Sequence, residues 1–149
     1  MYTKEEKREF RIQFWDGFKR YSKKQGRKMT SWVLKGTQIK EAQLKFDLNE
    51  DGAFVMLQID SKSDSKRYSV YDKFLKYKPV VQDTCGEDLV WDKNYFIKGF
   101  KEVSAIYFQF HKASVYNKEC WDEYYQFLFE KMTLLEEAYL DIKEVVQND

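Results

Sequence analysis

AQLKFDLNEDGAFVMLQID, residues 42–60, is the stretch that decides the fold of this chain. Apolar side chains occupy every second position on both sides of a turn: Ala42, Leu44, Phe46 and Leu48, then Val55, Leu57 and Ile59. This period of two is typical of half-buried strands. The pair Asp51-Gly52 between the two runs is a hairpin turn sequence, so residues 42–60 predict two antiparallel strands.

Further strands are expected around this hairpin. Short apolar runs at residues 32–34 and 89–91 indicate one strand each, and the first hairpin strand is predicted to begin near Ile39. Residues 103–110 (VSAIYFQF) are apolar on both faces, which is typical of a central strand. We therefore predict an antiparallel sheet of about four to five strands.

Three helices are predicted to pack on this sheet. Thr3 and Glu6 form a capping box and Gly26 supplies a stop, so the first helix lies between them. A second helix follows the polar loop 61–65, with a kink or restart at Pro79. The last and longest helix runs from near Asn117 to near Val146. The fold class is α+β, in a single domain over residues 1–149.

Composition limits the function classes. Aromatic residues make up 18% of the chain, whereas it has one histidine and two cysteines. The apolar runs are too short to span a bilayer, and the N-terminus has no signal-peptide stretch. We expect a cytoplasmic protein without membrane association, in which Cys85 and Cys120 are reduced structural thiols.

One candidate catalytic pattern is Asp51 with Asp60-Ser61-Lys62, which resembles a metal-dependent nuclease signature. Asp51 and Asp60 lie at opposite ends of one strand, about 30 Å apart at 3.3 Å per residue, so they cannot share an ion. Glu41 is expected opposite Asp60 and could replace Asp51. A solvated strand end with a local ion pair is the favoured interpretation, and a nuclease using Asp60, Lys62 and Glu41 is the alternative.

Other chemical signatures are missing from the sequence. His111 ends a strand and has no identifiable nucleophile or orienting acid. With Cys85 and Cys120 it does not form a zinc pattern, and the isolated glycines form no phosphate-binding loop. We therefore expect no cofactor and no metal site, and we favour a function other than catalysis.

A basic cluster closes the first helix. It consists of Lys19, Arg20, Lys23, Lys24, Arg27 and Lys28. Its position beside Tyr21 and Trp32 suits contact with a nucleic-acid backbone. A charged solvent face of the helix is the favoured interpretation, because a net charge of +1 is low for a dedicated nucleic-acid binder. Lys23, Lys24 and Arg27 lie off the apolar stripe of the helix, so their joint replacement by alanine is expected to leave the fold intact.

The last helix has an apolar face of about half its circumference, which is broader than a single core-facing stripe. Phe129 and Leu140 extend apolar character to its polar side. Uncovered apolar surface of this kind marks interaction sites. We therefore expect a protein partner or a homodimer through this helix.

Several short motifs occur in an order that resembles a bacterial and archaeal family, the domain of unknown function 4268. They are residues 14–18 (FWDGF), Trp32, residues 36–39 (GTQI), Phe46, residues 71–75 (YDKFL), residues 86–87 (GE), Leu89, Trp91 and Asn117-x-x-x-Trp121. The resemblance spans roughly residues 9–139. It implies no catalytic residues. Some members of the family look like the C-terminal part of longer proteins with a nuclease-like N-terminal domain, whereas others, similar to this chain, stand alone. We therefore expect a non-catalytic binding or accessory module, for which association with nucleic-acid processing is one option.

Overall fold

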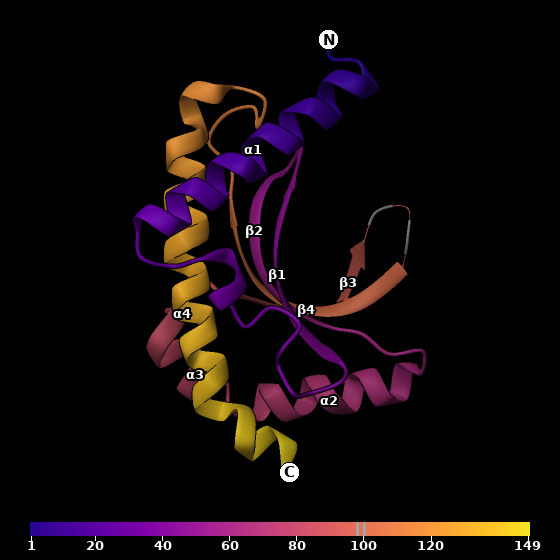
Figure 1. The fold of residues 1–149 in the computed structure, drawn as a ribbon. Coiled ribbons are helices and arrows are strands. Elements are labelled where there is room, and N and C mark those ends of the chain that lie inside the picture. The colour runs from indigo at the N-terminus through magenta and orange to yellow at the C-terminus, as the bar shows by residue number, and fades with distance from the viewer. Residues whose placement is uncertain (98, 100) are drawn as a thin grey trace.

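The computed structural model describes residues 1–149 except Lys98 and Phe100 (Figure 1). The described elements follow one another in this order: α1 Lys4–Lys24, the 3₁₀ turn η1 Met29–Ser31, β1 Ala42–Asn49, β2 Gly52–Ile59, α2 Asp64–Lys76, α3 Lys78–Cys85, β3 Val90–Ile97, β4 Lys101–Phe110, η2 Lys118–Cys120 and α4 Trp121–Gln147. This is the α+β class predicted from the sequence, with a long C-terminal helix.

The sheet contains four described strands in the order β1-β2-β4-β3, and all neighbours are antiparallel. β1 and β2 form the predicted hairpin, in which Asn49 pairs with Gly52 across the turn. β4 lies between β2 and β3, so its apolar residues on both faces do mark a central strand. β1 and β3 are the two edges.

Residues 32–34 and 39–41, predicted as strands, are irregular. The chain turns tightly before β1, because the carbonyl of Ile39 accepts from the N–H of Ala42 at 3.0 Å and the hydroxyl of Thr37 donates to the carbonyl of Ala42 at 2.7 Å. Local side-chain bonds of this kind compete with strand pairing.

β3 is longer than the predicted segment 89–91. Its polar centre hides it from pattern analysis, since the register with β4 shifts between Asp92 and Tyr95. An irregularity of this kind inserts residues that break the period of two.

The helix ends follow the predicted signals. The hydroxyl of Thr3 accepts from the N–H of Glu6, and the carboxylate of Glu6 accepts from the N–H of Thr3, both at 3.0 Å. Gly26 follows α1 with φ of 94°. The predicted second helix is two helices, α2 and α3, because the chain restarts after Tyr77 with Pro79 in the first turn of α3.

The apolar face of α4 is buried inside the chain. Figure 1 shows α1 crossing α4, with the sheet behind them and α3 beside the lower half of α4. Leu128, Met132 and Leu135 are each at most 1% exposed. Phe129, expected to be uncovered, packs on Trp32 with ring centroids 5.4 Å apart. None of the described helices has the length and apolar content needed to cross a membrane.

Candidate functional site

The predicted basic cluster is divided among several places in the structure. Arg20 and Lys24 line a pocket between α1 and the start of α4. Lys19 lines a different pocket on the β1 side of α1, while Lys23 and Lys28 are exposed. The side chain of Arg27 points into the fold instead, so the cations of this cluster lie in four different surroundings.

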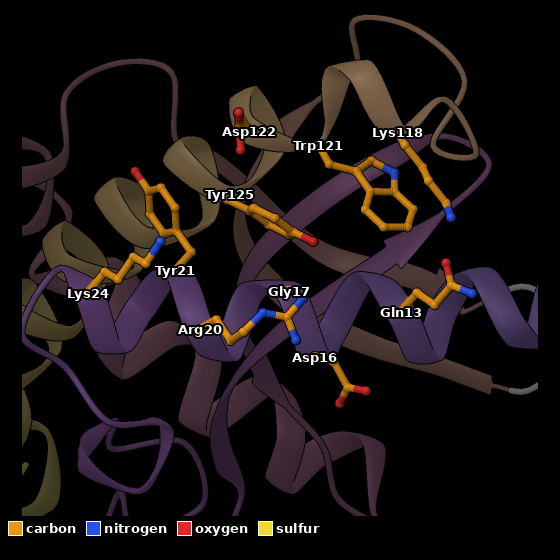
Figure 2. Close-up of a pocket in the computed structure, with 10 residues that line it drawn as sticks. All are labelled: Gln13, Asp16, Gly17, Arg20, Tyr21, Lys24, Lys118, Trp121, Asp122 and Tyr125. Atoms are coloured by element: carbon orange, nitrogen blue, oxygen red, sulfur yellow. The ribbon is translucent and has the colours of Figure 1, made fainter.

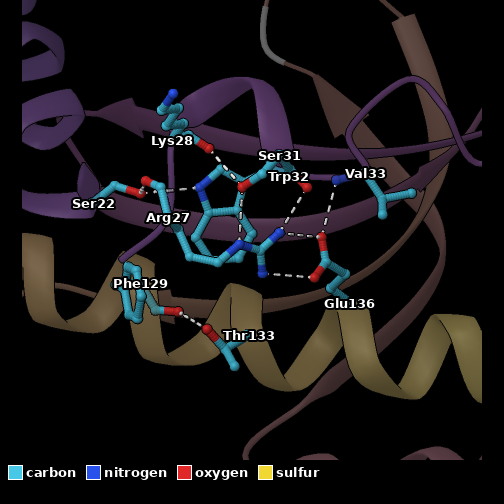
Figure 3. Close-up of polar contacts among 9 residues, drawn as sticks. All are labelled: Ser22, Arg27, Lys28, Ser31, Trp32, Val33, Phe129, Thr133 and Glu136. Atoms are coloured by element: carbon cyan, nitrogen blue, oxygen red, sulfur yellow. Dashed lines mark hydrogen bonds and ion pairs between the residues drawn. The ribbon is translucent and has the colours of Figure 1, made fainter. Parts of the chain in front are cut away.

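Arg27 is a structural residue (Figure 3). Its guanidinium donates to both carboxylate oxygens of Glu136, at 2.8 and 3.1 Å, and to the carbonyl of Ser31 at 2.8 Å. It also lies 3.7 Å from the ring centroid of Trp32, within cation–π range. Glu136 is 8% exposed and accepts a further bond from the N–H of Val33 at 2.9 Å. These contacts weigh against the expectation that Arg27 can be replaced by alanine without affecting the fold.

The pocket between α1 and α4, here called the α1–α4 pocket, has a volume of about 560 Å³. Figure 2 shows the side chains that surround it. They are Gln13, Asp16, Gly17, Arg20, Tyr21 and Lys24 of α1, Lys118 of η2, and Trp121, Asp122 and Tyr125 of α4.

Gly17 allows the two helices to approach each other. The hydroxyl of Tyr125 donates to the carbonyl of Phe14 at 2.8 Å, which places the phenol directly against the backbone of α1. A Cβ atom at Gly17 would lie 2.1 Å from this hydroxyl oxygen. The glycine of the FWDGF stretch is therefore required by the closeness of Tyr125.

The aromatic wall of the pocket is fixed by packing and by hydrogen bonds. The ring of Phe14 lies 4.9 Å from that of Tyr125 and 5.3 Å from that of Trp121, distances at which aromatic pairs stabilise each other. The indole N–H of Trp121 donates to the carbonyl of Val115 at 2.8 Å. These rings form a rigid surface under the charged side chains.

The pocket carries a small excess of positive charge, because Arg20, Lys24 and Lys118 face two carboxylates, Asp16 and Asp122. In the described part of the chain, no ion pair involves Arg20 or Lys24. Their charges are therefore available to a ligand.

The two tyrosines of the pocket remain neutral at physiological pH. Burial raises the pKa of Tyr125 to about 12, and Asp122 contributes in the same direction. The pKa of Tyr21 is raised by burial and by the negative charges of Glu130 and Asp122. Neither phenol is therefore prepared to act as a base at this pH.

Two of the ten residues that line this pocket, Arg20 and Lys24, were site candidates in the sequence analysis. Arg20 and Lys24 were recognised from local charge density, whereas Lys118, Trp121 and Tyr125 come from residues almost one hundred positions away. Trp121 appeared only within a short motif of the resemblance. No period or charge run indicates that the start of α4 meets the end of α1, so this contact needs the structure.

Two of the three residues of the nuclease alternative, Glu41 and Asp60, lie close together. Glu41 and Asp60 line a second pocket of about 570 Å³, and the N–H of Asp60 donates to the carbonyl of Glu41 at 2.9 Å, as the hairpin predicted. Asp60 forms an ion pair with Lys101, and Lys62 does not line this pocket. Among the described residues, no three His, Cys, Asp or Glu side chains are grouped so that they could hold a metal.

The remaining candidates are separate from both pockets. His111 is exposed. Cys85 is buried, and burial raises its pKa to about 11, so it is a protonated thiol of low reactivity. Neither cysteine forms a disulfide.

Comparisons with known proteins identify a family. Comparison with curated proteins gives no match, and comparison with solved structures gives none either. The model of the family described as a domain of unknown function (DUF4268) matches residues 10–143. Because this match covers most of the 149 residues, the chain belongs to that family.

Proposed function

We propose that this protein is a non-catalytic binding module that holds the phosphate backbone of a nucleic acid at the α1–α4 pocket, in association with a nucleic-acid-processing partner. One observation carries the proposal. Arg20 and Lys24 lie with Lys118 around a pocket with an aromatic wall. Such combinations of cations and rings are used to bind single strands without sequence preference.

The charges set the expected strength of binding. Two carboxylates in the pocket oppose three cations, so affinity at physiological salt is modest. The exposed side chains of Lys23 and Lys28 extend the positive surface beyond the pocket. Because the contacts are to phosphates, binding releases counterions and reads little base sequence.

Tyr21 is the half-exposed ring of this pocket, whereas Trp121 and Tyr125 are 9% and 6% exposed. A base can therefore stack on Tyr21, while the other two rings act as its support. We expect single strands to bind better than duplexes, since a duplex does not present an unstacked base.

The proposal is tested by fluorescence anisotropy with labelled single-stranded and double-stranded oligonucleotides at several salt concentrations. In the variant Arg20→Ala/Lys24→Ala, the slope of log affinity against log salt is expected to fall by about two units. The matched control Arg8→Ala/Lys66→Ala removes the same charge from exposed positions outside the pocket. Equal effects of both variants, or no binding by the wild type at low salt, would contradict the proposal.

A metal-dependent nuclease is the second candidate, because Glu41 and Asp60 do share a pocket. Two observations weigh against it: Asp60 pairs with Lys101, and Lys62 is not among the residues that line the pocket. Titration with Mg²⁺ or Mn²⁺, followed by tryptophan fluorescence, distinguishes the two functions. Specific binding that Asp60→Ala abolishes would favour the nuclease.

A homodimer through α4 and a cytoplasmic location are further parts of the proposal. Phe129 is partly buried against Trp32, whereas Leu140 and Val145 are exposed apolar residues of α4, at 45% and 43%. Two free cysteines agree with a reducing compartment. Light scattering that gives only an 18.1 kDa species at micromolar concentration would exclude the dimer.

A further inference from the structure

The β1 side of α1 has a second pocket with different chemistry, here called the β1-edge pocket. Its volume is about 640 Å³. α1 contributes Trp15 and Lys19, the loop after η1 contributes Trp32 and Lys35, and β1 contributes Lys45 and Phe46. The pocket therefore lies along an edge strand of the sheet, where backbone groups are available for pairing.

The register of the hairpin shows which backbone groups of β1 face outward. Asn49 and Gly52 close the turn, and hydrogen-bonded and non-hydrogen-bonded pairs alternate from there along an antiparallel ladder. Leu44 and Phe46 consequently direct their N–H and C=O groups away from β2. The bond from the N–H of Leu44 to the carbonyl of Leu34, at 2.9 Å, confirms this orientation.

Beyond Leu44 the edge is open. The hydrogen bonds that described residues make outside the regular elements do not include the carbonyl of Leu44 or the N–H and carbonyl of Phe46. The open groups lie where the β1-edge pocket reaches the strand. An extended peptide residue opposite Phe46 can exchange two hydrogen bonds with it.

The side chains around the β1 edge determine which peptide residues fit there. Opposite residues of an antiparallel pair point to the same face, and Phe46 packs with the helix-side core near Phe18 and Trp32. The peptide residue opposite Phe46 therefore directs its side chain toward the rings of the pocket, which favours a large apolar residue. Its two neighbours point the other way, as Lys45 does.

The positive charge around the β1-edge pocket favours acidic residues on either side of the apolar peptide residue. Lys19, Lys35 and Lys45 surround the pocket with Asp16 as the one lining carboxylate, and no ion pair of the described residues involves these lysines. We propose that the β1 edge binds an extended peptide of a partner protein, in which acidic residues flank a large apolar residue. A second copy of the chain fits less well, because two such edges would bring the lysines of both copies together.

The experiment uses a library of random peptides displayed on phage, selected on the full-length protein. The expected binders carry a large apolar residue between acidic ones, and they bind about tenfold more weakly to Lys35→Glu/Lys45→Glu. The control Lys23→Glu/Lys28→Glu makes the same charge change at exposed positions outside this pocket and is expected to keep most of the affinity. Basic binders, or binders that do not distinguish the two variants, would overturn the proposal.

A selected peptide then tests strand pairing directly. N-methylation of the amide of its apolar residue is expected to abolish binding, because that amide donates to the carbonyl of Phe46. N-methylation of the next residue, whose amide points away from β1, is expected to have little effect. Equal loss at both positions, or equal tolerance, would show that the peptide does not add a strand to β1. Shifts of the Trp15 and Trp32 signals in the concentrated protein alone would assign the pocket to a second copy instead.

Discussion

The two sides of α1 are built differently. Toward α4, Gly17 allows the hydroxyl of Tyr125 to reach the backbone of Phe14, and the aromatic wall is nearly closed to solvent. Toward β1, Trp15 and Phe46 are only partly buried, and a length of strand edge remains unpaired. On the α4 side, α1 is in direct contact with another helix. On the β1 side, its contacts include those made through the loop between α1 and β1.

This difference indicates two kinds of binding surface on one helix. The α1–α4 pocket has a rigid wall with charged side chains above it, which suits a ligand recognised by charge. The β1-edge pocket offers backbone groups and apolar space, which suits a ligand recognised by strand pairing and shape. Substitutions that disturb one side of α1 and leave the other intact can distinguish the contributions of the two sides to stability and binding.

Loss of Glu136 is expected to have the largest effect, on the loop side. Glu136→Ala leaves the guanidinium of Arg27 and the N–H of Val33 without the carboxylate that both contact. Removing one partner of a buried ion pair costs about 3 kcal/mol or more of unfolding free energy. Urea denaturation measures this loss.

The matched control is Glu137→Ala, an exposed neighbour on the same helix. It is expected to change stability by less than about 0.5 kcal/mol. If Glu136→Ala costs no more than this control, the loop is held by other contacts.

Gly17→Ala is expected to disturb the α4 side, with a loss of about 2 kcal/mol. Alanine normally stabilises a helix relative to glycine by about 1 kcal/mol, so a loss here reports the contact with Tyr125. Gly36→Ala is the control, since a Cβ at Gly36 would meet nothing nearer than 3.9 Å. Thermal unfolding compares the two.

The double variant Gly17→Ala/Tyr125→Phe sharpens this result. It removes the hydroxyl that lies 2.1 Å from the new Cβ, although the ring carbon at 2.9 Å remains. Partial recovery of stability relative to the sum of the single changes is expected. Strict additivity would mean that the two residues do not interact.

Alkaline pH is expected to weaken both sides gradually. The pKa values of Tyr125 and Tyr139 are raised by burial from 10.0 to about 12, and Tyr139 donates to the carbonyl of Thr37 in the loop. Between these values the unfolded chain loses protons that the folded chain keeps. The contribution of these two phenols to stability is therefore unchanged below pH 10 and falls above it, by about 1.4 kcal/mol per pH unit for each phenol.

Denaturant titrations between pH 9 and pH 11.5 test this dependence, with Tyr139→Phe as the variant that flattens it. Absorbance at 295 nm reports ionised tyrosine. Full ionisation of all eleven tyrosines at pH 10.5 in a chain that keeps its native circular dichroism would contradict the assignment.

Sequence patterns correctly predicted those parts of the fold that depend on residues close together in the sequence. The hairpin, the capping box of α1, the restart at Pro79 and the central position of β4 all follow from period, turn residues or caps. The failures at residues 32–34 and 39–41 have a common cause. Their apolar residues pack on the helix-side core without pairing as strands, and composition alone does not distinguish these two forms of burial.

The candidate site was less accessible to sequence analysis. Arg27 and Lys24 are indistinguishable as cations in the sequence, yet one contacts a buried carboxylate on α4 and the other faces a pocket. The difference depends on a residue more than one hundred positions away. Local charge density can identify cations at a helix end, but only tertiary contacts show which of them are available to a ligand.

Nucleic-acid binding at the α1–α4 pocket can be tested by titrating the ¹⁵N-labelled protein with a single-stranded oligonucleotide, because the four tryptophans of the chain report on different regions. Trp121 lines the α1–α4 pocket, Trp15 and Trp32 line the β1-edge pocket, and Trp91 lies on β3 beside Tyr71. We expect the indole N–H signal of Trp121 to move with added oligonucleotide and the signal of Trp91 to stay in place. No movement at saturating oligonucleotide, or movement of Trp91 without Trp121, would contradict the assignment of nucleic-acid binding to the α1–α4 pocket.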